Sequence, residues 1–236
     1  MTEILLIRHG ETAWNAERRL QGHLDIALNA AGLQQARLLG LALKNEKLDA
    51  IIASDLQRAK QTADSIAGWH NQPVKQDTQL RERCFGGFQG LLYSELETRY
   101  PVEFAAWQMR DPDAQFPADA SADQGESLRT FHQRCISIIR YYAQQYAGKT
   151  IALVAHGGVL ESAYREAKQL PLNTRREVGI LNASINRFTV SADQFRLNLW
   201  GDIAHLSTNL DANLDASLDI HLGHTKQDGQ PVLDEI

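Results

Sequence analysis

Short apolar runs alternate along the chain with longer segments in which apolar residues recur every three or four positions. Runs with the length and β-branched content of buried strands occupy residues 4–7, 49–53 and 150–155. Helical spacing of apolar residues marks 30–44, where Leu33, Ala36, Leu39 and Leu43 recur, and 126–146. A further helix is expected at 159–169. This alternation of strands and helices is typical of an α/β fold with a mainly parallel sheet.

Three other segments complete the predicted framework. Residues 183–200 alternate between apolar and polar positions around a central turn, which predicts an antiparallel hairpin at one edge of the sheet. A short strand is expected at 73–77. Residues 93–125 predict a helical insertion followed by a loop, and they hold seven acidic residues against two arginines, a net charge of −5.

Two of the predicted helices have recognisable starts. Asn29 is a favourable N-cap for the helix at 30–44. Ser54 and Gln57 have the Ser-x-x-Gln form of a capping box, so another helix is expected to start there. Arg58 would lie in its first turn, where the helix dipole favours anions over cations. An arginine at that place indicates a negatively charged group nearby.

Polar residues follow two of the buried strands directly. The first strand leads into Arg8, His9 and Gly10, and the third leads into His156 and Gly157. If these strands are neighbours, both His-Gly ends face one pocket at the carboxyl edge of the sheet, where open α/β sheets bind ligands. Arginine supplies donors of the kind that an anionic oxygen accepts. The pattern therefore predicts an anion-binding site.

Composition narrows the class of partner. The formal net charge is −5 and 43% of the residues are hydrophobic, so the chain lacks the basic surface that binds nucleic acid. No apolar stretch approaches the roughly 20 residues of a membrane helix, and the first residues show no signal pattern. The two cysteines, Cys84 and Cys135, are too few for a disulfide scaffold, and Cys135 lies on an apolar helix stripe. We therefore expect a cytoplasmic protein with a small-molecule partner, no nucleic acid and no membrane.

Residues 6–15, Leu-Ile-Arg-His-Gly-Glu-Thr-Ala-Trp-Asn, resemble the signature of the histidine phosphatase superfamily, the phosphoglycerate mutase-like enzymes that carry phosphate on a histidine. Further segments match that family in order along the chain. They are Gln21-Gly22, residues 54–63, the segment around Glu82, Gly125-Glu126-Ser127 and His156-Gly157. The resemblance extends from about residue 4 to residue 200. It implies a three-layer α/β/α sandwich with a mainly parallel sheet and an antiparallel edge.

The resemblance also implies a role for each matched residue. His9 would attack phosphorus, and Glu82 would donate a proton to the leaving group. The groups around the phosphate oxygens would be Arg8, Arg58, Asn15 and His156. The remaining substrate-binding residues would be Gln21, Gly22 and Gly157. No metal and no cofactor is expected, because arginines and an imidazolium would stabilise the charge.

Three functions are compatible with the resemblance. The first expectation is a phosphomonoesterase that hydrolyses a small phosphorylated metabolite. The alternative is a 2,3-bisphosphoglycerate-dependent phosphoglycerate mutase. Mutases of the family have a basic insertion with paired arginines, whereas residues 93–125 are acidic here and only Arg81 and Arg83 oppose that charge. The third is a non-catalytic phospho-ligand-binding protein, which the retention of every matched segment disfavours.

The end of the chain differs in composition from the rest. Residues 201–236 contain seven acidic residues and one lysine, a net charge of −6. Leucines recur there at every fourth position, but aspartates would repel one another at the same spacing in a helix. We expect a catalytic domain at 1–203 and an acidic, flexible tail at 204–236. Its leucine face is a candidate contact with the body of the protein or with a second copy in a homodimer.

Overall fold

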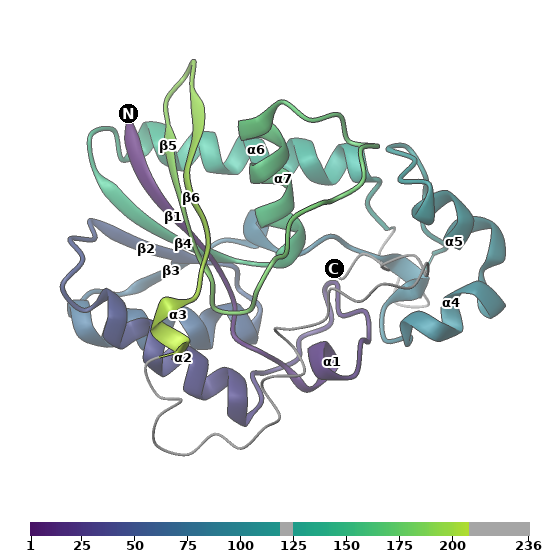
Figure 1. Ribbon diagram of the computed structural model, residues 1–236, viewed down its shortest axis with the longest axis horizontal. Helices are drawn as coiled ribbons and strands as arrows, with labels where there is room; N and C mark the ends of the chain where they lie inside the picture. The colour runs from purple at the N-terminus through teal and green to yellow at the C-terminus, as the bar shows by residue number, and fades with distance from the viewer. Residues whose placement is uncertain (119–124, 208–236) are drawn as a thin grey trace.

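The computed structural model describes residues 1–118 and 125–207. Within these residues a six-stranded sheet has the order β3-β2-β4-β1-β5-β6 (Figure 1). Its strands are β1 (Thr2–Arg8), β2 (Ala50–Ala53), β3 (Val74–Gln76), β4 (Thr150–Ala155), β5 (Ile185–Val190) and β6 (Phe195–Asp202). Strands β3, β2, β4 and β1 are parallel, and β5 and β6 add an antiparallel edge. The expected sheet, with its hairpin at one edge, is confirmed.

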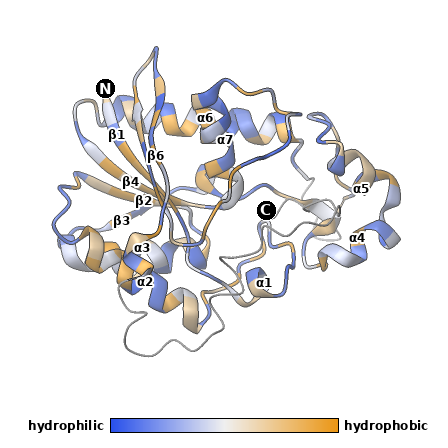
Figure 2. Cartoon of the chain, in the orientation of Figure 1, coloured by the Kyte–Doolittle hydropathy of each residue, from blue (hydrophilic) through white to orange (hydrophobic). Residues whose placement is uncertain are grey.

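Helices cover both faces of the sheet. They are α2 (Ala30–Leu43) and α3 (Gln57–His70) on one face, and α6 (Leu128–Gln145) and α7 (Gly157–Lys168) on the other. Successive side chains of a strand point to opposite faces, so Leu5 and Ile7 of β1 pack with α2 and α3, whereas Ile4 and Leu6 pack with α6 and α7. Figure 2 shows the central strands mainly in the hydrophobic colours. The expected three-layer α/β/α sandwich is confirmed.

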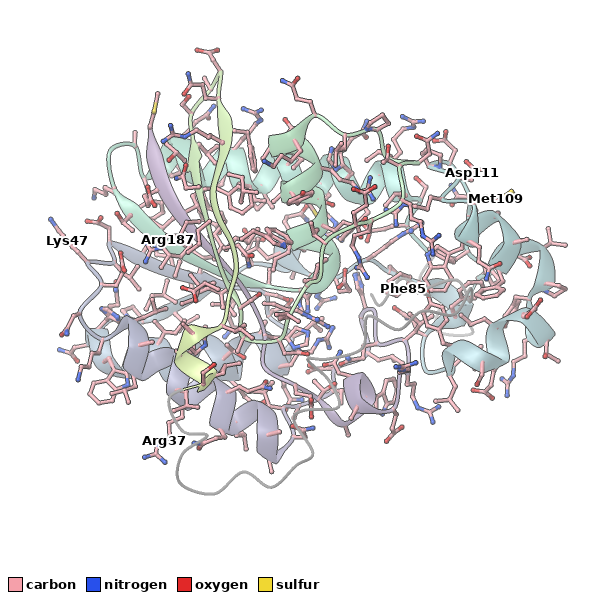
Figure 3. All side chains as sticks on the ribbon, viewed as in Figure 1. Arg37, Lys47, Phe85, Met109, Asp111 and Arg187 are labelled. Atoms are coloured by element: carbon pink, nitrogen blue, oxygen red, sulfur yellow. The ribbon has the colours of Figure 1, made fainter. Side chains whose placement is uncertain are left out.

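A smaller unit built by the predicted insertion stands beside the sandwich (Figure 1). It contains α4 (Tyr93–Arg99) and α5 (Pro101–Gln108), with two short 3-10 helices, Thr78–Leu80 and Gly86–Phe88, in the segment before it. Its core is an aromatic cluster formed by Phe85, Phe88, Phe104, Phe116 and Trp107. Figure 3 shows Phe85 between this unit and the sandwich. The helical insertion is confirmed, but Asp119 and Asp123 lie outside the described residues.

The predicted capping box at Ser54 is wrong. Helix α3 begins at Gln57 with Leu56 as its N-cap, and the Ser54 hydroxyl accepts a hydrogen bond from the Leu56 N–H instead. The Asp25 carboxylate, from a distant loop, accepts from the Gln57 backbone N–H at 2.7 Å and takes over the capping function. Arg58 nevertheless lies in the first turn, as expected.

Other helix predictions need smaller corrections. Asn29 caps α2 as predicted, by accepting a hydrogen bond from the Gly32 N–H. Leu33 does not belong to the buried stripe of α2, because it is 51% exposed. Helix α7 starts directly after His156 rather than at Val159, and α6 starts at Leu128 with Ser127 as its N-cap. Cys135 lies in the core, as predicted.

The expected tail is described only at its beginning. Residues Ala204–Ser207 form the short helix α8, which contacts α2. The rest of the acidic tail, and the leucine face from residue 210 onward, lie outside the described residues. Among the helices that the structure does describe, none combines the length and the apolar character needed to cross a membrane.

Candidate active site

The two strands with His-Gly ends are neighbours in the sheet. Strands β1 and β4 are parallel, with Arg8 opposite Ala155, so both chains leave the sheet at the same edge. The imidazole rings of His9 and His156 are 5.1 Å apart between centroids and are inclined by 60°. The predicted meeting of the two strand ends is therefore confirmed.

His9 is a buried imidazole whose tautomer is set by its own loop. Its Nδ1 lies 2.6 Å from the Gly10 carbonyl oxygen, which can only accept, so Nδ1 carries the proton. Burial, and then the guanidiniums of Arg58 and Arg8, hold the pKa of His9 well below its ordinary value. The ring is neutral near pH 7, and its Nε2 offers a lone pair.

His156 is fully buried and has the opposite tautomer. Its Nδ1 accepts a hydrogen bond from Arg58 Nε at 3.2 Å, so the proton of the neutral ring is on Nε2. Burial, followed by the charge of Arg58, holds the pKa of His156 well below its ordinary value. Nε2 has no hydrogen-bond partner among the described residues. The site thus contains a buried N–H donor, which a ligand can satisfy.

Two buried arginines flank the imidazoles. Arg58 is 1% exposed, and it donates from its terminal nitrogens to the carbonyl oxygens of Leu24 (2.9 Å) and Gly22 (2.8 Å). Burial lowers the pKa of Arg58 to about 10, which leaves it charged at neutral pH. Arg8 donates from Nη1 to the Ile180 carbonyl oxygen. These hydrogen bonds hold two cations in place before any ligand binds.

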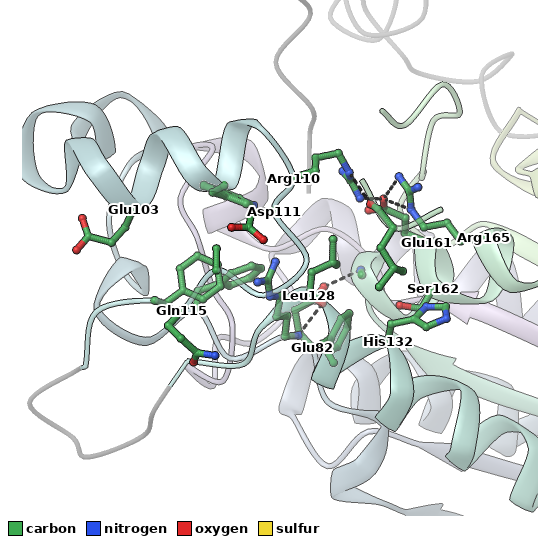
Figure 4. A pocket seen from close by; sticks show the side chains of 18 residues that line it. Glu82, Glu103, Arg110, Asp111, Gln115, Leu128, His132, Glu161, Ser162 and Arg165 are labelled. Atoms are coloured by element: carbon green, nitrogen blue, oxygen red, sulfur yellow. Dashed lines mark hydrogen bonds and ion pairs between the residues drawn. The ribbon is translucent and has the colours of Figure 1, made fainter. Parts of the chain in front are cut away.

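The carboxylate of Glu82 is held by two backbone groups. Its Oε1 accepts from the Arg83 N–H at 2.8 Å, and its Oε2 accepts from the Gly158 N–H, in the first turn of α7, at 3.0 Å (Figure 4). A Cβ atom on Gly158 would lie 2.3 Å from Glu82 Oε1, so the absence of a side chain there makes room for the carboxylate. Glu82 is only 7% exposed.

A cavity at this edge of the sheet, here called the inner cavity, collects most of the predicted site residues. Those that line it are Arg8, His9, Asn15, Gln21, Gly22, Arg58 and Glu82. His156 contacts the ring of His9 and the guanidinium of Arg58, and Gly157 begins α7 beside it. Neither of these last two lines the inner cavity.

The predicted binding residues other than arginine are also fixed locally. Asn15 Oδ1 accepts from the N–H and the hydroxyl of Thr12, so the amide nitrogen of Asn15 remains as a donor. The buried Gln21 Oε1 has no partner in the described part of the chain. Gly22 has a φ of 53°, and a Cβ there would lie 2.1 Å from Gln89 Oε1, which makes glycine the residue that fits this turn.

Three residues that line the inner cavity were not predicted from the sequence: Arg19, Leu20 and Phe85. Arg19 stacks on Trp14 at 5.5 Å and donates to the Gly90 carbonyl oxygen. The signal available for Phe85 was its position after the Glu82-Arg83 pair, in a glycine-rich loop. No comparable signal marked Arg19 or Leu20.

A second cavity, here called the outer cavity, lies between the insertion and the first turns of α6 and α7 (Figure 4). It shares Glu82 and Phe85 with the inner cavity, and Arg83, Phe116, Leu128 and Gly158 line it as well. The Arg83 guanidinium lies 4.4 Å from the Phe116 ring centroid and donates through Nε to the Glu126 carbonyl oxygen. Burial lowers the pKa of Arg83 to about 10, so the outer cavity holds a buried cation.

Charged side chains also meet at the far end of the outer cavity. Arg110, Arg165 and Arg176 all converge on the carboxylate of Glu161. Burial alone would raise the pKa of Glu161, but the three guanidiniums hold it below its ordinary value. Arg165 also donates to the carbonyl oxygens of Pro171 and Thr174, so this cluster fixes the loop after α7. Within the described residues, no three His, Cys, Asp or Glu side chains are grouped so that they could hold a metal ion.

Comparison with known proteins agrees with this arrangement. Residues 4–203 match the family model of the histidine phosphatase superfamily, branch 1. Phosphoglycerate mutase-like protein 4 of Arabidopsis thaliana is 39% identical over 207 residues, covering 86% of each chain. The metal-independent phosphoserine phosphatase of the same plant is 35% identical over 210 residues, covering 88% of this chain and 84% of the relative.

A solved structure supports the same relationship. The phosphoserine phosphatase of Entamoeba histolytica, in complex with 3-phosphoglyceric acid, superposes with a TM-score of 0.76 at 27% identity, covering 87% of this chain and all of that one. The protein described here therefore belongs to the histidine phosphatase superfamily. Its class is that of the phosphoric monoester hydrolases with the phosphoglycerate mutase-like fold.

Proposed function

We propose that this protein hydrolyses a small phosphorylated metabolite through a phosphohistidine on His9. The supporting observation is the pair of neutral imidazoles, His9 and His156, 5.1 Å apart and of opposite tautomer. One ring offers a lone pair for attack, and the other offers an N–H to the charge that develops on the phosphate. Glu82 lines the same cavity as His9 and is the proton donor of the proposal.

In the first step, the Nε2 lone pair of His9 attacks phosphorus in line with the leaving oxygen. A nitrogen–phosphorus bond forms and the phosphorus–oxygen bond to the leaving group breaks. The departing oxygen takes the proton from a protonated Glu82 carboxyl group. The step yields the free alcohol, phosphorylated His9 and the Glu82 carboxylate. The bond from Nδ1 to the Gly10 carbonyl oxygen holds the ring in position throughout.

In the second step, water attacks the phosphorus atom of phosphohistidine. An oxygen–phosphorus bond forms, the nitrogen–phosphorus bond breaks, and the Glu82 carboxylate accepts the proton that water gives up. Inorganic phosphate leaves, and both His9 and the Glu82 carboxyl group return to their starting states. The same carboxyl group therefore acts first as an acid and then as a base.

We propose that Arg8, Arg58, Asn15 and His156 bind the phosphate oxygens. The hydrogen bonds from Arg58 to Gly22 and Leu24 fix this cation before phosphate arrives, which is the preorganisation that charge stabilisation requires. The donor at His156 Nε2 and the amide nitrogen of Asn15 are not used by other described residues. We assign Gln21 and Gly22 to the walls that shape the phosphate site. Gly157 does not line the inner cavity, and we propose that it acts beside His156 at the start of α7.

The leaving group is proposed to occupy the outer cavity, because Glu82 lines both cavities. Its aromatic wall and the cation of Arg83 suit a small organic group with a carboxylate. Two similar proteins support this class, since one is named a phosphoserine phosphatase and another is seen with 3-phosphoglyceric acid. A small carboxylated phosphomonoester is therefore the proposed substrate.

Phosphoglycerate mutase activity is the second candidate, because a relative at 39% identity is named as mutase-like and Arg83 offers a cation for a second anionic group. Two features favour hydrolysis. Arg81 already forms an ion pair with Asp55, so it is not available to neutralise a bisphosphate. Glu103 and Asp111 line the outer cavity and would repel a second phosphate.

The test is a panel of phosphorylated metabolites with inorganic phosphate as the readout. Phosphoserine and 3-phosphoglycerate are expected to release phosphate, and 3-phosphoglycerate with a trace of 2,3-bisphosphoglycerate should release it faster than 2-phosphoglycerate forms. Rapid isomerisation with little phosphate release would identify a mutase instead. Binding of these compounds without any turnover would identify a phospho-ligand-binding protein.

Activity is expected to be independent of added divalent metal, because the proposed phosphate site has the cations of Arg8 and Arg58. Treatment with a chelator, followed by the phosphate-release assay, should leave the rate unchanged. A rate that disappears and returns with Mg²⁺ or Zn²⁺ would contradict the mechanism.

We further propose that the protein works in the cytoplasm. Neither Cys84 nor Cys135 forms a disulfide within the described residues, and burial raises the pKa of the Cys135 thiol, so it resists oxidation. A homodimer remains a prediction from the leucine face of the tail. Light scattering on the full chain and on a chain ending at residue 207 would test it.

A further inference from the structure

The segment Gly125-Glu126-Ser127 has no role in the proposed chemistry, yet its glutamate is tied closely to the loop that carries Glu82. The Glu126 carboxylate accepts from the Cys84 N–H at 2.9 Å. Its backbone N–H donates to the Cys84 carbonyl oxygen at 2.8 Å, and its own carbonyl oxygen accepts from Arg83 Nε. Glu126 thus holds the two residues that follow Glu82.

Arg134, on the second turn of α6, holds the same loop from the other side. It forms a bidentate ion pair with Glu126, with both nitrogen–oxygen distances at 2.7 Å. Its remaining donors reach the carbonyl oxygens of Gln79 (2.7 Å), Arg81 (3.0 Å) and Glu82 (3.2 Å). One guanidinium therefore joins a carboxylate to three carbonyl groups of the segment that ends at Glu82.

From this geometry we propose that Glu126 and Arg134 are positioning residues for the Glu82 carboxyl group, so that they control proton transfer to the leaving group and not phosphate binding. The inference rests on the proposed function. It deepens that function by assigning the pair to one step of it. Neither residue lines the inner cavity, and the ion pair is mostly buried, with side-chain exposures of 14% and 21%.

The physical reason is the short reach of proton transfer. A carboxyl group must lie within hydrogen-bond distance of the leaving oxygen, and small misplacements cost rate. The segment from Gln79 to Glu82 has no strand partner, and Arg134 donates to three of its carbonyl oxygens. The Glu82 carbonyl oxygen also lies 2.9 Å from His23 Nε2, whereas those of Gln79 and Arg81 are held by Arg134. The ion pair of Glu126 and Arg134 is here called the clamp. The proposed phosphate-binding residues Arg8, His9, Arg58 and His156 come from β1, α3 and the end of β4. The clamp forms no hydrogen bond to these elements among the described residues.

The test compares two substrates that differ in how much they need the acid. The leaving group of p-nitrophenyl phosphate is p-nitrophenolate, a stable anion that needs no proton. An alkyl ester such as phosphoserine needs a proton on its leaving oxygen. The readout is kcat/KM, which covers only the steps up to departure of the leaving group and excludes the hydrolysis of phosphohistidine that both substrates share. For Arg134→Lys and Glu126→Gln, kcat/KM on phosphoserine should fall by about 10²-fold, the usual size of general-acid catalysis. The kcat/KM on p-nitrophenyl phosphate should change by less than about threefold, as should the inhibition constant of inorganic phosphate, because phosphate binding is untouched.

A matched control comes from the ion pair between Arg187 and Glu46, which is also bidentate and partly buried. Figure 3 shows Arg187 well away from Phe85, a residue that lines both cavities. Arg187→Lys and Glu46→Gln should leave the ratio of the two rates unchanged. They also report how much a comparable loss of stability affects the assay.

A double variant tests whether the clamp acts through Glu82. If the clamp acts through Glu82, adding Arg134→Lys to Glu82→Gln should produce no further change in the ratio of the two rates. Equal losses on both substrates, a loss of phosphate binding, or an additive double variant would each overturn the clamp. A wild-type protein without turnover, or a Glu82→Gln variant without leaving-group dependence, would instead overturn the proposed function, and the clamp with it.

Discussion

The ends of β1 and β4 have the same sequence pattern, histidine followed by glycine, but the two histidines have opposite tautomers in the structure. His9 Nδ1 faces a carbonyl oxygen and donates, whereas His156 Nδ1 faces the guanidinium of Arg58 and accepts. Both rings are buried, and both have a lowered pKa. The difference between a lone pair and an N–H at Nε2 is thus decided by one neighbour of each ring.

The backbone around the two histidines also differs. His9 makes three hydrogen bonds to other segments through its backbone: its N–H donates to the Ala155 carbonyl oxygen, and its carbonyl oxygen accepts from the Ala183 N–H and the Asn182 side chain. The next N–H, that of Gly10, donates to the Thr62 hydroxyl. His156 instead is the N-cap of α7 and passes directly into a helix. The backbone at the proposed nucleophile therefore makes more hydrogen bonds to other segments, which suits a group whose position must be fixed.

Replacing each histidine by glutamine should separate their roles most clearly. Glutamine offers an N–H but no nucleophilic nitrogen, so His9→Gln should abolish phosphate release and leave no acid-labile phosphoenzyme after rapid quenching. His156→Gln keeps a donor near the phosphate and should lose about 10²-fold in kcat, with the phosphoenzyme still detectable. If His9→Gln were the more active variant, the assignment of the two roles would be reversed.

The next largest effect is expected at Arg58, which sets the tautomer of His156. In Arg58→Lys the charge is kept, but the Nε donor to His156 and the bonds to Gly22 and Leu24 are lost. We expect a fall in kcat/KM of about 10²-fold in a steady-state assay, as for the loss of other preorganised donors. A rate within about threefold of wild type would show that charge alone suffices at this position.

The glycines near the two strand ends should differ as well. A Cβ on Gly158 would meet Glu82 Oε1 at 2.3 Å, whereas a Cβ on Gly10 would meet the Gly32 carbonyl oxygen at 2.5 Å. Gly158→Ala should therefore lower kcat on alkyl phosphates by about tenfold or more through Glu82. Gly10→Ala should lower the melting temperature, because backbone cannot move aside as a side chain can. It should also lower kcat/KM equally on alkyl and p-nitrophenyl phosphates, because the Gly10 carbonyl oxygen holds the His9 ring.

An exposed helix glycine provides the control for these two variants. A Cβ on Gly68 in α3 would meet nothing within 4 Å. Gly68→Ala should leave kcat unchanged and stabilise the protein by up to about 1 kcal/mol, the usual gain inside a helix. If Gly158→Ala lowered kcat/KM equally on alkyl and p-nitrophenyl phosphates, the special link between Gly158 and Glu82 would be contradicted.

The parts of the fold that depend on residues close together in the chain could be predicted from the sequence. The strands and main helices follow from apolar periodicity, and Asn29 caps α2 as its side chain dictates. The start of α3 was predicted wrongly because Asp25, distant in sequence, caps it in place of Ser54. Leu33 was misassigned because its face of α2 meets solvent rather than the sheet.

The candidate site also has a part that the sequence predicts and a part that it does not. Residues at strand ends and in the first turn of α3 were found, because those elements bring them to one edge. The tautomers of His9 and His156, the place of Arg19 and Phe85, and the contact of Arg134 with the Glu82 loop depend on how loops pack. No spacing of residues in one sequence contains that information.

The smallest predicted effect compares the two histidines through the pH dependence of stability. A histidine in the unfolded chain titrates near pH 6.5, whereas the folded pKa values of His9 and His156 lie well below that. Between these values the unfolded chain binds more protons than the folded one. The contribution of each histidine to the free energy of unfolding is therefore complete above about pH 6.5, and it falls as the pH is lowered.

Each buried histidine should contribute a slope of at most about 1.4 kcal/mol per pH unit to the free energy of unfolding. Urea unfolding between about pH 6.5 and pH 5, above the usual carboxylate range, would measure it. His9→Gln and His156→Gln should each remove one such contribution, while His132→Gln should remove less, because the lowered pKa of His132 comes with a ring that is 17% exposed. If all three variants kept the wild-type slope, His9 and His156 would take up protons in the folded protein as they do in the unfolded chain. The neutral nucleophile proposed at His9 would then be ruled out below pH 6.5.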